Sequence, residues 1–196
     1  MAYPFFAMLF RMKYIHRWAL MRNTLSENLS EHAMETAAIT HALAVIRNKR
    51  FGAKVNAERA ALIGLYHAST EIITGDLPPP IKYRNEDLKN SYKQMESEAG
   101  KRMLSMLPEE LREEYTSLFE PTEEDKELWV LCKAADKLTA YIKCLEEEKM
   151  GNREFDHAGR STLATLQAME LPELTVFMEE YLPAFTLTLD ELNQGE

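Results

Sequence analysis

The chain has 196 residues, a formal net charge of -9, and a composition that is 45% hydrophobic and 28% charged. This length fits one domain with a real core, and the composition is that of an ordinary globular protein. Because nucleic-acid phosphates attract clustered Lys and Arg, the acidic balance excludes a general binder of nucleic-acid polymers. It leaves room for a small phosphorylated ligand held by a metal and a few local cations.

The N-terminal segment 4–10 is apolar, and Arg11 and Lys13 follow it closely. Such a segment is too short to span a bilayer, and no convincing cleavage site follows it. We therefore expect a helix over about 4–13 that docks on the core, and no membrane association. Residues 16–28 are expected to form an ordered loop.

The next helix is expected to run from Ser30, a plausible N-cap, to about Lys49. Its apolar residues form two stripes. One stripe contains Met34, Ala37, Ala38, His41, Ala42 and Val45, and the other contains Ile39, Leu43 and Ile46. A helix that is apolar on two sides lies deep in a bundle, so His41 is expected to be a core histidine.

The remaining helices are expected over about 56–71, 85–106, 122–145, 158–170 and 173–181. Asn56 is a suitable N-cap, and Gly75 with the prolines at 78–80 ends the helix that it opens. Thr122 begins a later helix, and Gly151 is a suitable stop for it. Strand-like alternation is scarce. The sequence therefore predicts a single all-α domain over residues 1–196.

Cysteine usage indicates a reducing compartment. Cys132 and Cys144 are the only cysteines, and they lie in one predicted helix, roughly 18 Å apart at the helical rise per residue. They cannot form a disulfide with each other, and neither belongs to a CxxC pair. We expect a cytoplasmic protein.

Three residues could hold a metal ion. His67 and Glu71 lie four residues apart in a predicted helix, which suits a metal ligand beside a proton-transfer group and equally suits a hydrogen bond along the helix. Asp136 follows small residues in a predicted buried helix, although Lys133 or Lys137 could pair with it. His32 lies in a first helical turn, where a structural role is the alternative.

Taken together, two imidazoles and a carboxylate from three helices suit a divalent transition metal such as Mn, Co, Fe, Ni or Zn. The wide spacing of His32, His67 and Asp136 in the sequence makes this only a weak pattern when it is taken alone.

Several segments together resemble the HD-domain phosphohydrolases, and most closely their bacterial 5'-deoxynucleotidase branch. The resemblance extends from about Phe5 to about Leu192. It is carried by residues 17–23 (RWALMRN), 27–32 (ENLSEH), 65–67 (LYH), 71–78 (EIITGDLP) and 134–136 (AAD). It implies a helical bundle around one metal, often a homodimer, that hydrolyses deoxyribonucleoside 5'-monophosphates to deoxynucleoside and phosphate.

The resemblance also implies residue roles. His32, His67 and Asp136 match the metal ligands of the family, for an ion such as cobalt or manganese. Glu71 matches the acid/base that acts on the attacking water or on the leaving 5'-oxygen.

The same resemblance assigns substrate contacts to three further residues. Arg17 and Trp18 match positions that contact the substrate near its phosphate, and the fork of an arginine suits phosphate oxygens. Asp76 matches the residue against the sugar, where it accepts from a 3'-hydroxyl and leaves no room for a 2'-hydroxyl.

One position departs from the family. The defining His-Asp dipeptide reads His67-Ala68 here, and the spacing to Glu71 is unchanged. Ala68 cannot ligate, and Ser69 points about 100° further round a helix. Because losing even a partner of a ligand costs about 10–100-fold in metal affinity, we expect a weakly held metal. An engineered replacement and a natural loss are both consistent with this difference.

The sequence therefore leaves three hypotheses. The first is a metal-dependent 5'-deoxynucleotidase-like enzyme. The second is a catalytically silent nucleotide-binding sensor of the same fold, and the third is a plain helical interaction domain.

Overall fold

The computed structural model describes residues 2–82 and 84–193, and this part of the chain is helical with no strand beyond an isolated bridge between His16 and Asn28. The elements are α1 (Phe5–Leu9), η1 (Phe10–Tyr14), α2 (Leu29–Phe51), α3 (Ala57–Tyr66), α4 (Glu71–Thr74), α5 (Pro79–Lys82), α6 (Glu86–Ser105), α7 (Glu109–Phe119), α8 (Lys126–Lys149), η2 (Arg153–Phe155), α9 (Asp156–Gln167), α10 (Pro172–Glu180), η3 (Leu182–Thr186) and α11 (Leu189–Asn193). The predicted all-α class is confirmed. Among the described residues, no helix combines the length and apolar character that a membrane crossing requires.

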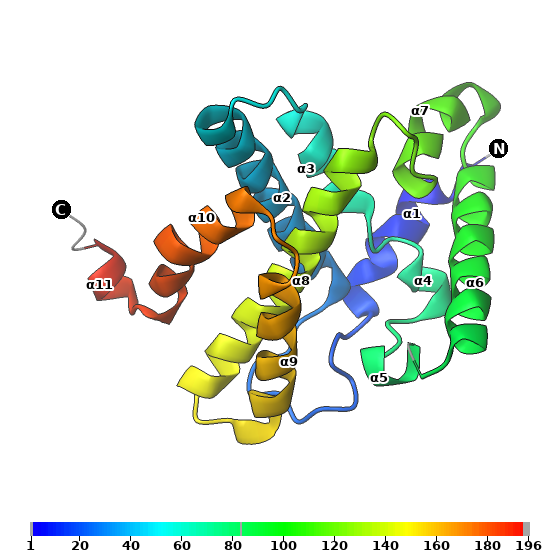
Figure 1. Ribbon diagram of the computed structural model, residues 1–196. Helices are drawn as coiled ribbons and strands as arrows, with labels where there is room; N and C mark the ends of the chain where they lie inside the picture. The colour runs from blue at the N-terminus through cyan, green and yellow to red at the C-terminus, as the bar shows by residue number, and fades with distance from the viewer. Residues whose placement is uncertain (1, 83, 194–196) are drawn as a thin grey trace.

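The core lies where α2, α3 and α8 pack together at the centre of the molecule. In Figure 1, α6 and α7 lie on one side of this centre, and α10 and α11 lie on the other. Leu43, Ile63 and Leu138 are fully buried in the core. A Cβ at Gly64 would lie only 2.7 Å from Cα of Ala37, so α2 and α3 approach each other as closely as glycine permits. This close contact places the end of α3 against α2.

Helix α2 begins earlier than expected because Asn28, and not Ser30, is its N-cap. The Asn28 side chain accepts hydrogen bonds from the backbone N–H groups of Ser30 and Glu31. The Glu31 carboxylate accepts in return from the Asn28 backbone N–H at 2.9 Å, which completes a capping box.

Only one of the two predicted apolar stripes of α2 is buried. Ile39, Leu43 and Ile46 face the core, whereas Met34 is 59% exposed and His41 is exposed. The expectation of a core histidine at position 41 was wrong. The other stripe is mixed, because Ala37 lies against Gly64 of α3 and Ala42 packs against the core, and both are partly buried.

Asn56 caps α3 as predicted, but the helix ends at Tyr66 and does not reach Glu71. A turn follows, in which Ser69 N–H donates to the Tyr66 carbonyl and Glu71 N–H donates to the Ala68 carbonyl, each at 3.0 Å. These hydrogen bonds join residues three apart in the sequence, whereas those of an α-helix join residues four apart. His67 and Glu71 are therefore joined by a turn and do not share one continuous helix face.

Other boundaries differ in detail. The expected helix over 4–13 is split into α1 and η1, and the prolines after residue 78 begin the short α5, which is consistent with proline in a first helical turn. Helices α7 and α11 were not predicted. The ranges of α6, α9 and α10 agree with the expected ranges to within a few residues. Both cysteines are buried and free, as expected.

The loop between η1 and α2 is anchored to α8 by a buried ion pair. The carboxylate of Glu147 accepts from the backbone N–H groups of Thr24 and Leu25, from Asn152 Nδ2 at 2.6 Å and from Lys143 Nζ at 2.5 Å. Lys143 also donates to the Leu25 carbonyl. Glu147 is 1% exposed and Lys143 5% exposed, so the pair is shielded from water.

We predict that Glu147→Gln lowers the free energy of unfolding by about 3–5 kcal/mol, because it leaves the Lys143 charge buried without its partner. Urea denaturation at pH 7 measures the loss. Glu148→Gln, an exposed neighbour on α8, is the matched control and should be near neutral. Equal stability of the two variants would contradict the anchoring role.

The Glu147 carboxylate should make the free energy of unfolding depend on pH. Burial alone would raise the pKa of Glu147, but hydrogen bonds from Lys143, Asn152 and Thr24 outweigh burial and lower it from 4.5 to about 2. The folded state thus favours the charged form, so the stabilisation is complete above pH 4.5 and is lost as the pH falls towards 2. The stability difference between the unmodified chain and Glu147→Gln should shrink over that range, and a constant difference would refute this.

Candidate active site

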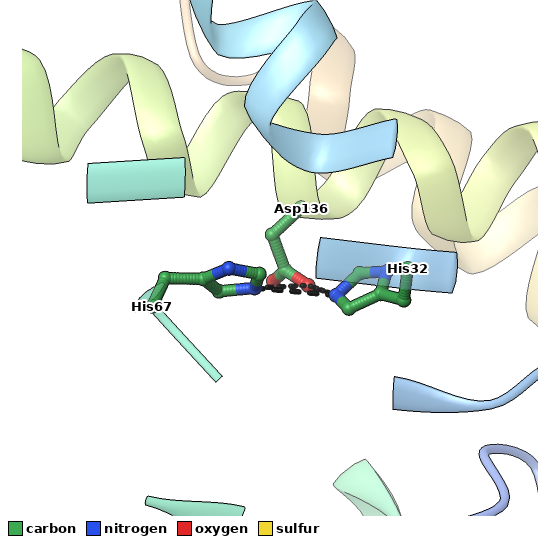
Figure 2. Close-up of side chains that lie close together, drawn as sticks. All are labelled: His32, His67 and Asp136. Atoms are coloured by element: carbon green, nitrogen blue, oxygen red, sulfur yellow. Dashed lines mark hydrogen bonds and ion pairs between the residues drawn. The ribbon is translucent and has the colours of Figure 1, made fainter. Parts of the chain in front are cut away.

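Three predicted site residues from three different elements lie together: His32 on α2, His67 directly after α3, and Asp136 on α8 (Figure 2). Nε2 of His32 lies 3.2 Å from Nε2 of His67 and 3.2 Å from Oδ1 of Asp136. Nε2 of His67 lies 3.9 Å from the same oxygen. All three potential ligand atoms lie within 4.8 Å of one another.

The hydrogen bond of His67 fixes which of its ring nitrogens carries the proton. Nδ1 lies 2.7 Å from the backbone carbonyl oxygen of Gly64, which can only accept. Nδ1 therefore carries the proton, and Nε2 presents a lone pair to the site. Burial also lowers the pKa of His67, which favours the neutral ring.

His32 presents a lone pair for a similar reason. The Thr139 hydroxyl donates to the Asp136 backbone carbonyl at 2.9 Å, so at its 3.2 Å contact with Nδ1 of His32 it acts as the acceptor. Nδ1 then carries the proton and Nε2 is bare. Burial and the charge of Arg17 lower the pKa of His32 to about 3, so this fully buried ring is neutral near pH 7.

The three atoms that face one another are thus all acceptors. Burial alone would raise the pKa of Asp136, but the pKa lies well below its usual range and the charge of Lys137 contributes to this lowering, so the carboxylate is charged. Oδ2 lies 3.2 Å from Nζ of Lys137, which leaves Oδ1 towards the imidazoles. Acceptors this close repel each other unless a cation lies between them. Two imidazole nitrogens held by Nδ1–H bonds, with one carboxylate, fit a divalent transition metal.

Glu27 holds the two predicted phosphate-side residues together. Its Oε1 accepts from Nε of Arg17 at 2.9 Å and its Oε2 accepts from Nε1 of Trp18 at 3.0 Å. Oε1 also lies 3.6 Å from Nδ1 of His32. One partly buried carboxylate therefore joins the loop before α2 to the cluster of acceptors. Glu27 lies in one of the segments that carry the family resemblance, but no pattern in the sequence assigns it this role.

Trp18 has a backbone conformation that is unusual for a residue with a side chain. Its φ is 58°, in the left-handed region. The Trp18 carbonyl accepts from Met21 N–H at 2.9 Å and from Asn23 Nδ2 at 3.2 Å, and its ring packs edge-on against Phe155. Such strain persists only where the surroundings fix it, which is typical of binding sites.

Glu71, Asp76 and Arg17 interact electrostatically beside this cluster. Burial and the charge of Asp76 raise the pKa of Glu71 to about 8, against the opposing charge of Arg17. Its Oε2 is buried and lacks a hydrogen-bond partner among the described residues. Burial alone would lower the pKa of Arg17, but the carboxylates of Glu27, Asp136, Asp76 and Glu71 raise it. Arg17 thus interacts electrostatically with each titratable residue of the predicted site.

Ala68 packs against apolar side chains. It is 2% exposed and belongs to a cluster with Met12, Leu29 and Ala33. Ser69 is fully buried, and its hydroxyl donates to a backbone carbonyl of the preceding turn at 2.6 Å. No side chain of the 67–70 turn other than His67 belongs to the acceptor cluster that the described residues form.

Comparison with known proteins identifies the family. The family described as 5'-deoxynucleotidase YfbR-like matches residues 4–185. The chain belongs to this family. A relative named 5'-deoxynucleotidase YfbR from Shigella boydii is 48% identical over 190 residues, which cover 97% of this chain and 96% of the relative.

Solved structures show the fold at lower identity. An HD-domain phosphohydrolase from Listeria innocua superposes with a TM-score of 0.79 at 21% identity, over 97% of this chain and 92% of that chain. The cyanophage S-2L HD phosphohydrolase DatZ, described as bound to dA and one catalytic Zn²⁺ ion, superposes with a TM-score of 0.64 at 19% identity, over 90% and 95% of the two chains. The helical arrangement is therefore that of HD-domain phosphohydrolases.

Proposed function

We propose that this protein is a metal-dependent phosphohydrolase that converts deoxyribonucleoside 5'-monophosphates to deoxynucleoside and phosphate. The observation that carries the proposal is the cluster of His32, His67 and Asp136, whose facing atoms are all acceptors. Membership of a family whose relatives are named 5'-deoxynucleotidases supports the choice of substrate.

His32, His67 and Asp136 would hold a divalent transition metal such as cobalt or manganese, and the catalytic Zn²⁺ named for DatZ supports a metal of this class. A bound cation of this kind would polarise the phosphate and acidify water near neutral pH. Three protein ligands leave open positions for substrate and water, as in other catalytic metal sites.

Glu71 would transfer a proton. With its pKa raised to about 8 by burial and Asp76, it holds a proton near neutral pH that it can donate to the leaving 5'-oxygen. Once deprotonated, the same carboxylate can accept a proton from the attacking water. The unpartnered Oε2 is consistent with an atom kept free for this exchange.

Arg17 and Trp18 would bind the substrate near its phosphate. Glu27 holds Nε of Arg17, which fixes the direction of the remaining guanidinium N–H groups, and these can stabilise charge on phosphoryl oxygens. Asp76 would lie against the sugar, accepting from the 3'-hydroxyl and excluding a 2'-hydroxyl. Its place directly after Gly75, close enough to Glu71 to shift that pKa, supports this position.

We further propose that the protein is a homodimer in the cytoplasm. Exposed apolar side chains at both ends of the chain, including Phe10 at 66% and Leu189 at 73%, are candidates for the contact. Two buried free cysteines suit a reducing compartment.

The proposal predicts that Glu71→Gln lowers turnover by about 10²–10⁴-fold and leaves nucleotide binding unchanged, because only the proton transfer is lost. Phosphate release is measured with deoxynucleoside monophosphates and added Mn²⁺ or Co²⁺, and binding is measured by calorimetry. Glu114→Gln, an exposed glutamate on α7, is the matched control. Equal losses of binding and rate, or no loss of rate, would show that Glu71 is structural.

One observation favours a second candidate, a catalytically silent nucleotide-binding protein. Ala68 stands where the family has an aspartate ligand, and its surroundings are apolar. The Ala68→Asp variant separates the candidates, because a carboxylate at this buried position is costly without a cation and favourable with one.

We predict that Ala68→Asp binds Mn²⁺ or Co²⁺ about 10–100-fold more tightly than the unmodified chain, releases phosphate faster, and is less stable in the presence of a chelator. Ala68→Asn is the matched control, since it has nearly the same size and no charge. If the Asp variant folds but neither binds metal better nor turns over faster than the Asn variant, the silent nucleotide-binding protein becomes the better candidate.

A further inference from the structure

Helix α6 contacts the segment that carries Asp76 through one buried hydroxyl. Tyr92 is 4% exposed, and its Oη donates to the Gly75 carbonyl oxygen at 3.0 Å. The same Oη lies 3.2 Å from Oγ1 of Thr74, which in turn lies 3.2 Å from the Gly75 carbonyl oxygen. Two hydroxyl groups from different helices thus converge on a single carbonyl.

This carbonyl controls the direction of the chain at Asp76. Gly75 has φ 77° and ψ 157°, a combination that essentially only glycine adopts. Glycine has wide conformational freedom, so its own backbone does not hold this geometry. The Gly75 carbonyl and the Asp76 N–H belong to one planar peptide unit. A hydrogen bond that fixes the carbonyl therefore fixes the plane from which Asp76 projects.

Tyr92 is itself held in place. Nζ of Lys82 lies 4.2 Å from the centre of the Tyr92 ring, a cation–π contact, and forms an ion pair with Glu96 at 2.8 Å. Glu96 is one turn after Tyr92 on α6, so the lysine joins two neighbouring positions of that helix. Burial raises the pKa of Tyr92, so the phenol keeps the proton that it donates.

We propose that Tyr92 is a positioning residue for sugar discrimination, acting through Gly75 on Asp76. The inference rests on the proposed role of Asp76 against the sugar. Without the Tyr92 hydroxyl, Gly75 can rotate, Asp76 no longer blocks the space of a 2'-hydroxyl, and ribonucleotides are admitted more readily.

The test is Tyr92→Phe, which removes one oxygen and keeps the buried ring. Dissociation constants for deoxyadenosine and adenosine 5'-monophosphate are measured by calorimetry with Mn²⁺, in a Glu71→Gln background that suppresses turnover. We expect the preference for the deoxynucleotide to fall about fivefold, as for the loss of one neutral hydrogen bond. Thr74→Val, which removes the second hydroxyl of the same contact, should lower the preference in the same direction.

Two further variants make the result specific. Tyr141→Phe removes a phenol from a half-buried tyrosine that lines the hollow between α8 and α9, and should leave the preference unchanged. In an Asp76→Ala background, Tyr92→Phe should have no additional effect on the preference, because its action passes through Asp76.

The outcomes separate this inference from the proposed function. If Asp76→Ala abolishes the preference but Tyr92→Phe leaves it unchanged, or weakens both nucleotides equally, the role of Tyr92 is refuted and that of Asp76 stands. Additive effects of Tyr92→Phe and Asp76→Ala refute the route through Asp76. If Asp76→Ala itself leaves the preference unchanged, or if neither nucleotide binds, the proposed sugar contact and this inference both fail.

Discussion

The structure of the site depends on one electrostatic constraint: three acceptor atoms face one another with no proton between them. His32 and His67 each use Nδ1–H elsewhere, for Thr139 and for the Gly64 carbonyl, so both Nε2 lone pairs point at the Asp136 carboxylate. The packing of α2, α3 and α8 holds these three residues together. Close contact at Gly64 brings the end of α3 to α2, and α8 supplies Asp136 together with the threonine that orients His32.

Residue types and their resemblance to a family were enough to predict the helical class and to select His32, His67 and Asp136, which the structure brings together; the roles of the site residues stay predictions. The sequence was less informative where a contact between distant residues decides where a helix ends or what a side chain does. It did not predict the break in α3, which depends on hydrogen bonds in the 67–70 turn. Nor did it assign a role to Glu27 or Tyr92, whose partners lie across a loop or on another helix. The predicted burial of the apolar stripe of α2 that contains Met34 and His41 was wrong because a stripe rich in alanine is tolerated in solvent as well as in a core.

At position 68, the apolar neighbours favour an apolar side chain, whereas metal binding would favour a carboxylate. We propose that a carboxylate at that position would ligate a cation, and without the cation the carboxylate would be a buried charge beside Met12, Leu29 and Ala33. Alanine removes this conflict and leaves a site of two imidazoles and one carboxylate. The other contacts of the candidate site do not involve position 68: Glu27 joins Arg17 to Trp18, and Glu71 interacts electrostatically with Asp76. We therefore propose that Ala68 weakens metal affinity and leaves the proposed substrate contacts in place.

The most direct test of the central claim is the metal content of the unmodified chain. The protein is dialysed against micromolar Mn²⁺, Co²⁺ or Zn²⁺, and the bound metal is measured by elemental analysis beside folded Asp136→Asn protein. We expect about one divalent cation per unmodified chain and far less in the variant, because the variant lacks the proposed charged ligand. A folded unmodified chain that retains no more metal than Asp136→Asn would contradict it.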